Sequence, residues 1–326
     1  MPIYYTEEEY RKILERTNKE QKVFMPNEIF DDLIKAIDVK EEGHSSKHIA
    51  YAFSYIYLIT YLYRYAKISN EHDFSEEGLK RLLTVSPTSK GKKGVNYITK
   101  RGGLLEELGY IYKVTDFPLA YFFDEEEKSI EFEYFSQVVE DGVPSQFVTN
   151  LKNKKINYPV KLLKTRIVKT SNGKEELDPI LDDVYYTTRI DLDIFIYCMS
   201  RKELGVESFY LYSFIKFMND IYGVCWNCPL VDLPKKVGMQ LDVIKSKLKS
   251  MEQYGMLHNT HEDFIIGAPQ GSESTKKANG YTVKRYGSFI KKEQQKRSYK
   301  RGKIKTYEEN EKIKNAVLEG CKFLTS

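Results

Sequence analysis

The pattern of apolar and polar positions predicts a chain of many helices and few strands. Residues 6–19 and 26–37 each have one apolar and one polar face, which is typical of surface helices. Residues 48–66 are apolar almost all round and predict a helix in a core. A short helix that begins at Ser75 and a turn over residues 86–94 follow.

The next elements predict a helix and a hairpin. Residues 95–108 have helical periodicity and stop at Gly109, a residue that favours the position after a helix. Residues 110–123 and 129–135 predict two strands joined by an acidic turn. Residues 136–185 contain several prolines and an Asn-Gly pair and predict a connector, and residues 186–196 predict a strand.

The second half repeats this order. An apolar-aromatic helix is predicted over residues 206–222, a short helix over 233–237, and a turn at Gly238. A strongly periodic helix over residues 240–254 stops at Gly255. Strands at residues 256–258 and 264–266 complete a second hairpin, and a last helix is predicted over 307–323.

Helix, short helix, turn, helix and β-hairpin, in this order, are typical of a winged helix-turn-helix. The pattern therefore predicts an α+β, mainly helical fold with two such modules, N-terminal helices and a basic C-terminal tail. The expected division is N-terminal helices 1–45, module one 46–135, connector 136–189, module two 190–270, and a tail with a terminal helix 271–326.

The last helix of such a module buries one face and presents the other to the major groove of DNA. In the second module Leu241, Ile244, Leu248 and Met251 share one stripe. Polar residues lie opposite, and lysines precede them in the short helix. The predicted DNA contacts of this module are Lys235, Lys236, Gln240, Lys245, Ser246, Lys249 and Gln253. Residues 258–263 are the expected wing.

The first module is less regular. Arg101 falls on the apolar side of the predicted helix, and Gly102-Gly103 lies inside it, at a cost of about 1 kcal/mol per glycine relative to alanine. The pair indicates either a close approach of backbone to DNA or a break in the helix. The predicted contacts here are Lys90, Lys92, Lys93, Asn96, Thr99 and Lys100.

Charge is unevenly distributed and favours a polyanionic partner. The net charge is +4, but residues 276–305 hold twelve Lys/Arg and one acid, or +11, so the remainder carries −7. Residues 86–101 and 152–174 are also basic and lack acids. Phosphate backbones bind such local clusters. The predicted contacts of the tail are Lys291, Lys292, Lys296, Arg297, Lys300 and Arg301.

Other chemistry is less favoured. Cys225 and Cys228 lack the second pair that zinc would need, so we expect plain thiols. His44 and His48 have a ligand spacing, and His258 and His261 lie in a predicted hairpin and not on the helix of a metalloprotease motif; we expect no metal and no cofactor. A divalent-cation site made of Asp182, Asp183, Asp191 and Asp193 is an alternative. No segment predicts a signal peptide or a membrane span, so we expect a cytoplasmic protein.

The two modules rest on GVNYITKRGGLLEELGYI and LPKKVGMQLDVIKSKLKSMEQYGML. Their layout over residues 48–135 and 190–266 resembles the tandem winged-helix replication initiators of plasmids and phages. The resemblance implies that both modules bind repeated origin sites in duplex DNA, that one mediates a homodimer, and that host replication proteins are partners.

We therefore expect a non-enzymatic, sequence-specific double-stranded DNA-binding protein, first of all a replication initiator. A transcriptional repressor of a mobile element and a metal-dependent nuclease targeted by winged helices are the two alternatives.

Overall fold

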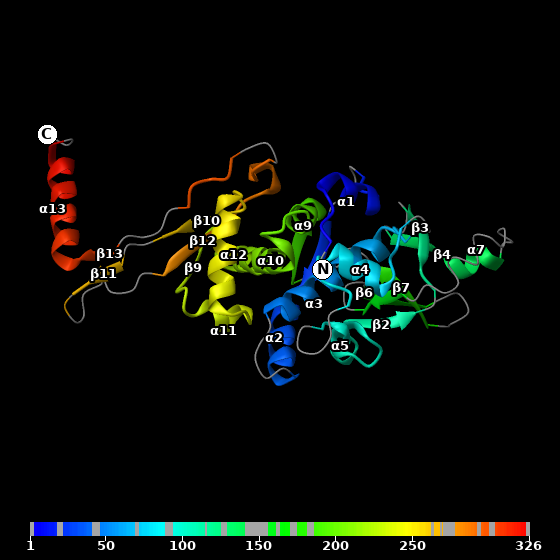
Figure 1. Ribbon diagram of the computed structural model, residues 1–326. Coiled ribbons are helices and arrows are strands. Elements are labelled where there is room, and N and C mark those ends of the chain that lie inside the picture. The colour runs from blue at the N-terminus through cyan, green and yellow to red at the C-terminus, as the bar shows by residue number, and fades with distance from the viewer. Residues whose placement is uncertain are drawn as a thin grey trace.

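The computed structural model shows an α+β protein in which about half of the described residues are helical (Figure 1). None of the described helices is long and apolar enough to cross a membrane. The residues described are 3–17, 22–40, 46–68, 72–88, 94–114, 116–124, 129–140, 156–160, 164–169, 175–180, 186–261, 264–267, 269, 278–291, 295–299 and 304–323.

The N-terminal region contains the two predicted helices and a strand that was not predicted. α1 (Glu7–Ile13) begins at a capping box, in which the Thr6 hydroxyl accepts from the Glu9 N–H and the Glu9 carboxylate accepts from the Thr6 N–H. β1 (Lys22–Pro26) follows, and then α2 (Glu28–Lys40). β1 pairs antiparallel with β8 (Thr187–Asp191), 161 or more residues away, so the N-terminal region closes onto the second half.

The first half is built on α3 (Ser46–Arg64), which is almost wholly buried, as its all-round apolar pattern predicts. α4 (Glu76–Leu82) follows, capped by Ser75. β2 (Ile111–Val114) comes before the hairpin of β3 (Pro118–Asp124) and β4 (Ser129–Tyr134). The predicted hairpin is therefore confirmed, with a break in its first strand.

The helix predicted over residues 95–108 is wrong, because the chain breaks at the double glycine. α5 (Asn96–Thr99) and α6 (Leu104–Glu107) are one turn each. Gly102 has φ +65°, and a side chain on Gly103 would place its Cβ 2.6 Å from the carbonyl oxygens of Tyr97 and Lys100. The break also explains Arg101, which is exposed in the turn instead of lying on a buried face.

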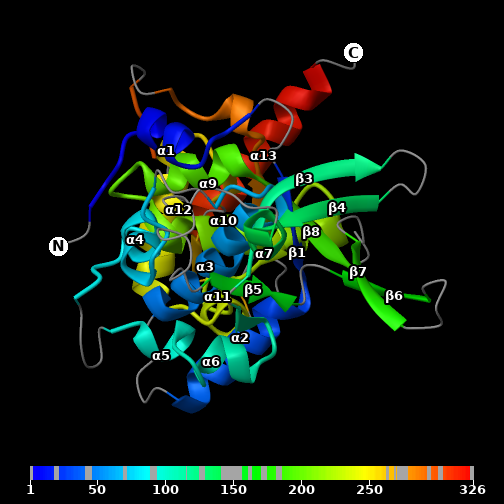
Figure 2. The same ribbon diagram turned by 90° about the vertical axis from the view of Figure 1, so that its right-hand side faces the viewer.

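The stretch predicted as a connector contains secondary structure. α7 (Phe135–Glu140) is followed by β5 (Ile156–Pro159) and by the hairpin of β6 (Lys164–Lys169) and β7 (Glu175–Ile180). β5 pairs antiparallel with β2 in a two-stranded sheet and contacts α3, so it belongs to the first half. Local sequence did not indicate this pairing, because its two strands lie more than 40 residues apart. The two hairpins β3–β4 and β6–β7 project from the same side of the molecule (Figure 2).

The second half begins with β8 and α9 (Leu192–Met199), so the strand predicted over residues 186–196 is wrong beyond Asp191. α10 (Gly205–Tyr222), β9 (Trp226–Cys228), α11 (Leu233–Val237) and α12 (Leu241–Gln253) follow. β10 (Leu257–Thr260) and β12 (Asn279–Val283) complete an antiparallel sheet in the order β10-β12-β9.

The hairpin predicted between residues 256–258 and 264–266 is wrong. β10 pairs with β12, while β11 (Phe264–Ile266) pairs in parallel with β13 (Ile304–Thr306). The predicted tail therefore supplies a strand of the second half. The predicted terminal helix is confirmed as α13 (Tyr307–Phe323), which stands apart from the body at the end of β11 and β13 (Figure 1).

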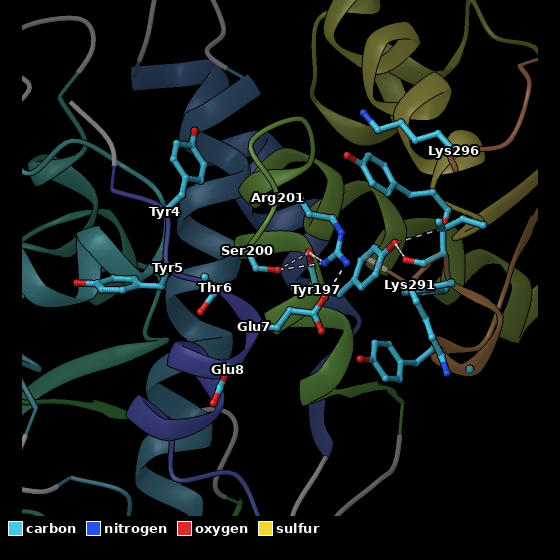
Figure 3. Close-up of a pocket in the computed structure, with 15 residues that line it drawn as sticks. Tyr4, Tyr5, Thr6, Glu7, Glu8, Tyr197, Ser200, Arg201, Lys291 and Lys296 are labelled. Carbon is cyan, nitrogen blue, oxygen red and sulfur yellow. Dashed lines mark hydrogen bonds and ion pairs between the residues drawn. The ribbon is translucent and has the colours of Figure 1, made fainter. Parts of the chain in front are cut away.

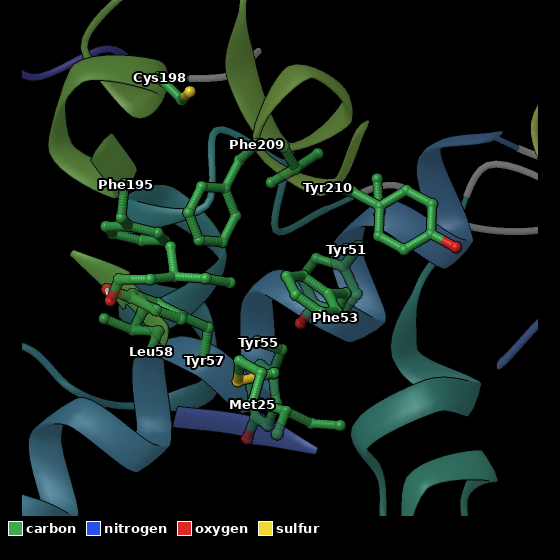
Figure 4. Packing of buried hydrophobic residues seen from close by; sticks show 14 of the residues in the cluster. Met25, Tyr51, Phe53, Tyr55, Tyr57, Leu58, Phe195, Cys198, Phe209 and Tyr210 are labelled. Atoms are coloured by element: carbon green, nitrogen blue, oxygen red, sulfur yellow. Dashed lines mark hydrogen bonds between the residues drawn. The ribbon is translucent and has the colours of Figure 1, made fainter. Parts of the chain in front are cut away.

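The two halves share one hydrophobic core. α3 packs along α10, and aromatic rings of both helices and of α9 interlock between them (Figure 4). The ring centroids of Tyr57 and Phe195 are 5.3 Å apart, and those of Phe53 and Tyr210 are 5.4 Å apart. The buried Tyr57 hydroxyl donates to the Ile190 carbonyl at 3.1 Å, which satisfies its polar group.

α1 lies across both halves and ties them together. The Tyr10 hydroxyl donates to the Leu82 carbonyl of α4 at 2.8 Å. On the other side, Arg11 and Arg16 each place a guanidinium nitrogen 2.8 Å from the buried carboxylate of Asp193 in α9. The two halves are therefore not separate globules, and their relative position is set by packing.

Candidate nucleic-acid interface

α12 is the helix that the sequence singled out, and it is a continuous helix of 13 residues. Gly238 provides the turn before it, with φ 68° and ψ 25°, and its N–H donates to the Pro234 carbonyl at 2.8 Å. The Gln240 N–H donates to the Ser46 hydroxyl at 2.8 Å. Ser46 begins α3, so the start of α12 is anchored on the first half. No local pattern indicated this contact.

The two faces of α12 differ as predicted. Ile244, Leu248 and Met251 are buried, and Leu241 is half-buried. The residues opposite are exposed or half-buried. Asp242, Lys245, Ser246 and Lys249 are exposed and Gln253 is half-buried, while Gln240 is exposed just before the helix.

Four exposed lysines lie on α11 and α12: Lys235, Lys236, Lys245 and Lys249. The Lys245 ammonium is 4.0 Å from the Asp242 carboxylate, at the limit of an ion pair, and both side chains are at least half exposed. Such a pair contributes little and leaves the lysine available to other anions. Lys247 of the same helix points inward instead and donates to the carbonyls of Glu203 and Leu204.

The chain beyond β10 is held against the last turn of α12. His261 Nε2 lies 2.9 and 3.1 Å from the two carboxylate oxygens of Glu252, and the Asn259 amide donates to Glu252 at 3.3 Å. Burial raises the pKa of Glu252 above its ordinary value, although its hydrogen bond with His261 acts in the opposite direction. Within the expected wing, His258 and Thr260 are exposed, whereas Glu262 and Asp263 lie outside the described residues.

The described part of the tail is partly occupied by internal contacts. The Lys296 ammonium lies 2.9 Å from the Glu203 carboxylate and 4.8 Å from the centre of the Tyr254 ring. The Arg297 N–H donates to the Gln253 carbonyl at the end of α12, and its guanidinium donates to the Ser288 carbonyl. Lys291 is exposed. Lys292, Lys300 and Arg301 lie outside the described residues.

This segment borders a cavity of about 820 Å³ between the N-terminal residues and the end of α12 (Figure 3). Three of the charged residues that line it, Glu7, Arg201 and Lys296, form ion pairs. Arg201 lies 2.6 Å from Glu7 and stacks on Tyr197, with its guanidinium carbon 3.4 Å from the ring centre. Lys296 pairs with Glu203, and this bond lowers the pKa of Glu203. The arrangement fits a joint between segments better than a reaction centre.

The first half uses its polar residues differently. Thr99 is fully buried, and its hydroxyl donates to Glu76, so its predicted outward orientation is wrong. Asn96 is exposed, but its amide oxygen accepts from the buried Lys80 ammonium at 2.6 Å. Lys100 is exposed in the turn after α5. Lys90, Lys92 and Lys93 lie outside the described residues.

The acidic residues considered for a metal site have other roles. The Asp193 carboxylate is buried between Arg11 and Arg16, and Asp191 lies 3.9 Å from Arg189. Asp182 and Asp183 lie outside the described residues. Among the described residues, no cluster of three or more His, Cys, Asp or Glu side chains is arranged to hold a metal ion.

Most of the histidine and cysteine residues considered for a metal site are also located in the structure. His48 is buried, with Nδ1 3.0 Å from the Tyr97 hydroxyl, and His44 lies outside the described residues. Cys198, Cys225 and Cys228 are free thiols, and burial raises the pKa of Cys198.

Comparison with known proteins gives no relative. The chain matches no protein-family model, and neither the curated proteins nor the solved structures contain a significant match.

Proposed function

We propose that this protein binds double-stranded DNA through α11 and α12, and that its second half is a winged helix-turn-helix. The observation that carries the proposal is the exposed face of α12, which is polar and lysine-bearing opposite a buried apolar stripe. A helix packed on one side and free on the other is what insertion into a major groove requires. The element order from α10 to β12 and the sheet order β10-β12-β9 also support it.

The exposed side chains fall into two groups, one suited to phosphate contacts and one to base contacts. Lys235, Lys236, Lys245 and Lys249 are suited to phosphates, because they are exposed cations on neighbouring elements. Ser246 and Gln240 are suited to base edges, because both are exposed and carry hydrogen-bonding groups. Phosphate contacts set affinity and base contacts set specificity, so the two sets predict different effects on mutation.

The tail plays a smaller part in this proposal. Lys296 and Arg297 are engaged in contacts with Glu203, Ser288 and Gln253, and these bonds compete with any phosphate contact. Their contribution to binding is therefore smaller than the +11 charge of residues 276–305 indicates.

Among the roles of a duplex-binding protein, we propose initiation of replication on a plasmid or phage, without an enzymatic activity of its own. The proposal rests on the order of elements that the sequence predicts for both halves and on the resemblance of this layout to tandem winged-helix initiators. It implies repeated sites in the DNA, a homodimer at some stage and host replication proteins as partners.

Selection of bound duplexes from a random-sequence pool tests the proposal directly. We expect enrichment of one short motif, with an affinity that falls steeply as salt rises because several lysines displace counterions. Occurrence of the motif as clustered direct repeats supports initiation, whereas a palindrome within a promoter supports repression. Absence of enrichment together with absence of any salt-dependent duplex binding would contradict DNA binding itself.

A further inference from the structure

Exposed apolar side chains flank β9, in the segment that comes just before α11. Four large apolar side chains are more than half exposed there: Ile221 by 51%, Tyr222 by 65%, Val224 by 81% and Val231 by 73%. The eleven residues 221–231 contain no charged side chain, although charged residues make up 30% of the chain. Isolated exposed apolar residues are ordinary, but such a concentration marks an interaction surface.

The backbone in the middle of this surface is also open. β9 lies at the edge of the three-stranded sheet and pairs with β12 on one side (Figure 1). In the described part of the chain, no strand pairs with its other side. Natural edge strands are commonly shielded by lysines, and residues 221–231 have none.

A hollow of about 730 Å³ adjoins the apolar residues. Gly223 and Val224 form part of its wall, so the hollow adjoins the segment that carries the exposed apolar side chains. Two of its charged pairs are internal, Lys216 with Asp220 at 3.0 Å and Arg189 with Asp191 at 3.9 Å.

Lys284 and Arg285 also line the hollow, and within the described residues they form no ion pair. Cations at this position attract the face of an aromatic ring.

We propose that a second copy of this chain packs on this face across a two-fold axis, with Tyr222 of each copy in the hollow of the other. A two-fold interface needs a surface that is complementary to itself. A projecting aromatic residue and a nearby hollow lined by two cations meet that need, because each copy supplies both.

The number of residues in the proposed interface sets the expected affinity of the dimer. A standard interface uses about 20–30 residues from each partner. Residues 221–231 and the rim of the hollow supply fewer, so we expect a dissociation constant in the micromolar range. The association does not depend on DNA and can be measured without it.

Sedimentation equilibrium of the full chain without DNA, from about 1 to 200 μM, tests the proposal. We expect the apparent mass to rise from 38.2 kDa towards twice that value. The double substitution Tyr222→Ser and Val224→Ser should weaken association at least tenfold. Tyr186→Ser with Val317→Ser is the matched control, because these residues are exposed by 66% and 60% on other surfaces.

Arg285→Ala provides a second and milder variant, for which we expect a loss of a few fold. It removes an exposed side chain and keeps the backbone of the segment, so it also serves if the double variant unfolds. A wild-type chain that stays at 38.2 kDa throughout would overturn the proposal. Dimerisation that neither the double variant nor Arg285→Ala weakens would overturn it as well, because the contact would then lie elsewhere.

Discussion

The sequence predicts the same order of elements for the two halves of the molecule, but the halves use their polar residues in opposite ways. In the second half, α12 is one continuous helix, and Lys245, Ser246 and Lys249 are exposed. In the first half, the corresponding region is broken into α5 and α6, and its polar groups turn inward. A similar pattern of apolar segments along the chain therefore does not imply an identical surface.

A partly buried polar network accounts for the inward orientation of these groups in the first half. Glu76 of α4 accepts hydrogen bonds from Thr99 and from Tyr55, and the Lys80 ammonium lies 3.7 Å from it. Tyr55 in turn accepts from the Asn157 amide of β5. These bonds join α3, α4, α5 and β5, so the polar residues of the first half hold its helices together.

The largest effect on stability should come from adding a side chain to the glycine pair between α5 and α6. Gly103→Ala should lower the free energy of unfolding by about 3 kcal/mol, because its Cβ would lie within 2.6 Å of two carbonyl oxygens. Gly102→Ala is the control in the same turn. It has open space and only a positive φ, so about 1 kcal/mol is expected. Urea denaturation measures the free energy of unfolding of both variants. Equal decreases would show that the backbone of the turn shifts to accommodate the Cβ of residue 103.

Removal of a buried hydroxyl should lower the free energy of unfolding more than removal of an exposed one, and this difference is the second largest effect expected. Thr99→Val should cost about 1–2 kcal/mol, because it removes the hydrogen bond that the buried Thr99 hydroxyl donates to Glu76. Ser246→Ala in α12 should change stability by less than about 0.5 kcal/mol, because that side chain is exposed. A comparable loss at both positions would remove the contrast between the halves.

These contrasts also show how far the sequence could predict the structure. The stripe of Ile244, Leu248 and Met251 is local, and it predicted α12 and its exposed face correctly. The partner of β10 is β12, which lies beyond an intervening loop and inside a basic stretch. Its Tyr281 is fully buried, so the short run Gly-Tyr-Thr-Val was a signal of a strand that the surrounding lysines and arginines concealed.

From the sequence, the break between α5 and α6 was only one of two alternatives, the other being a close approach of backbone to DNA. Two adjacent glycines weaken a helix, but whether the chain turns there depends on contacts that the local sequence does not contain. The inward orientation of Thr99 depends on Glu76, 23 residues earlier. The distribution of polar groups between core and surface was thus decided by tertiary contacts.

The smallest effect concerns the tail at the end of α12. The Lys296 contact lowers the pKa of Glu203, so this pair stabilises the folded state above the ordinary value of 4.5, and the contribution is lost as pH falls through the lowered value. Amide exchange of residues 295–299, corrected for intrinsic rates, should therefore accelerate in acid. Glu203→Gln should show the faster exchange already at neutral pH, and an unchanged rate in this variant would contradict the role of the pair.

The central claim is that the second half, through α12, binds DNA. Duplex affinity of three charge-reversal variants with the same change in net charge tests it: Lys245→Glu with Lys249→Glu, Lys100→Glu with Arg101→Glu, and the distant pair Lys12→Glu with Lys113→Glu. All six residues are exposed. We predict that the first variant loses at least a hundredfold in affinity at about 0.1 M salt while it remains folded, and that the other two lose much less. Equal losses in all three variants, or undiminished binding by the first, would contradict the claim.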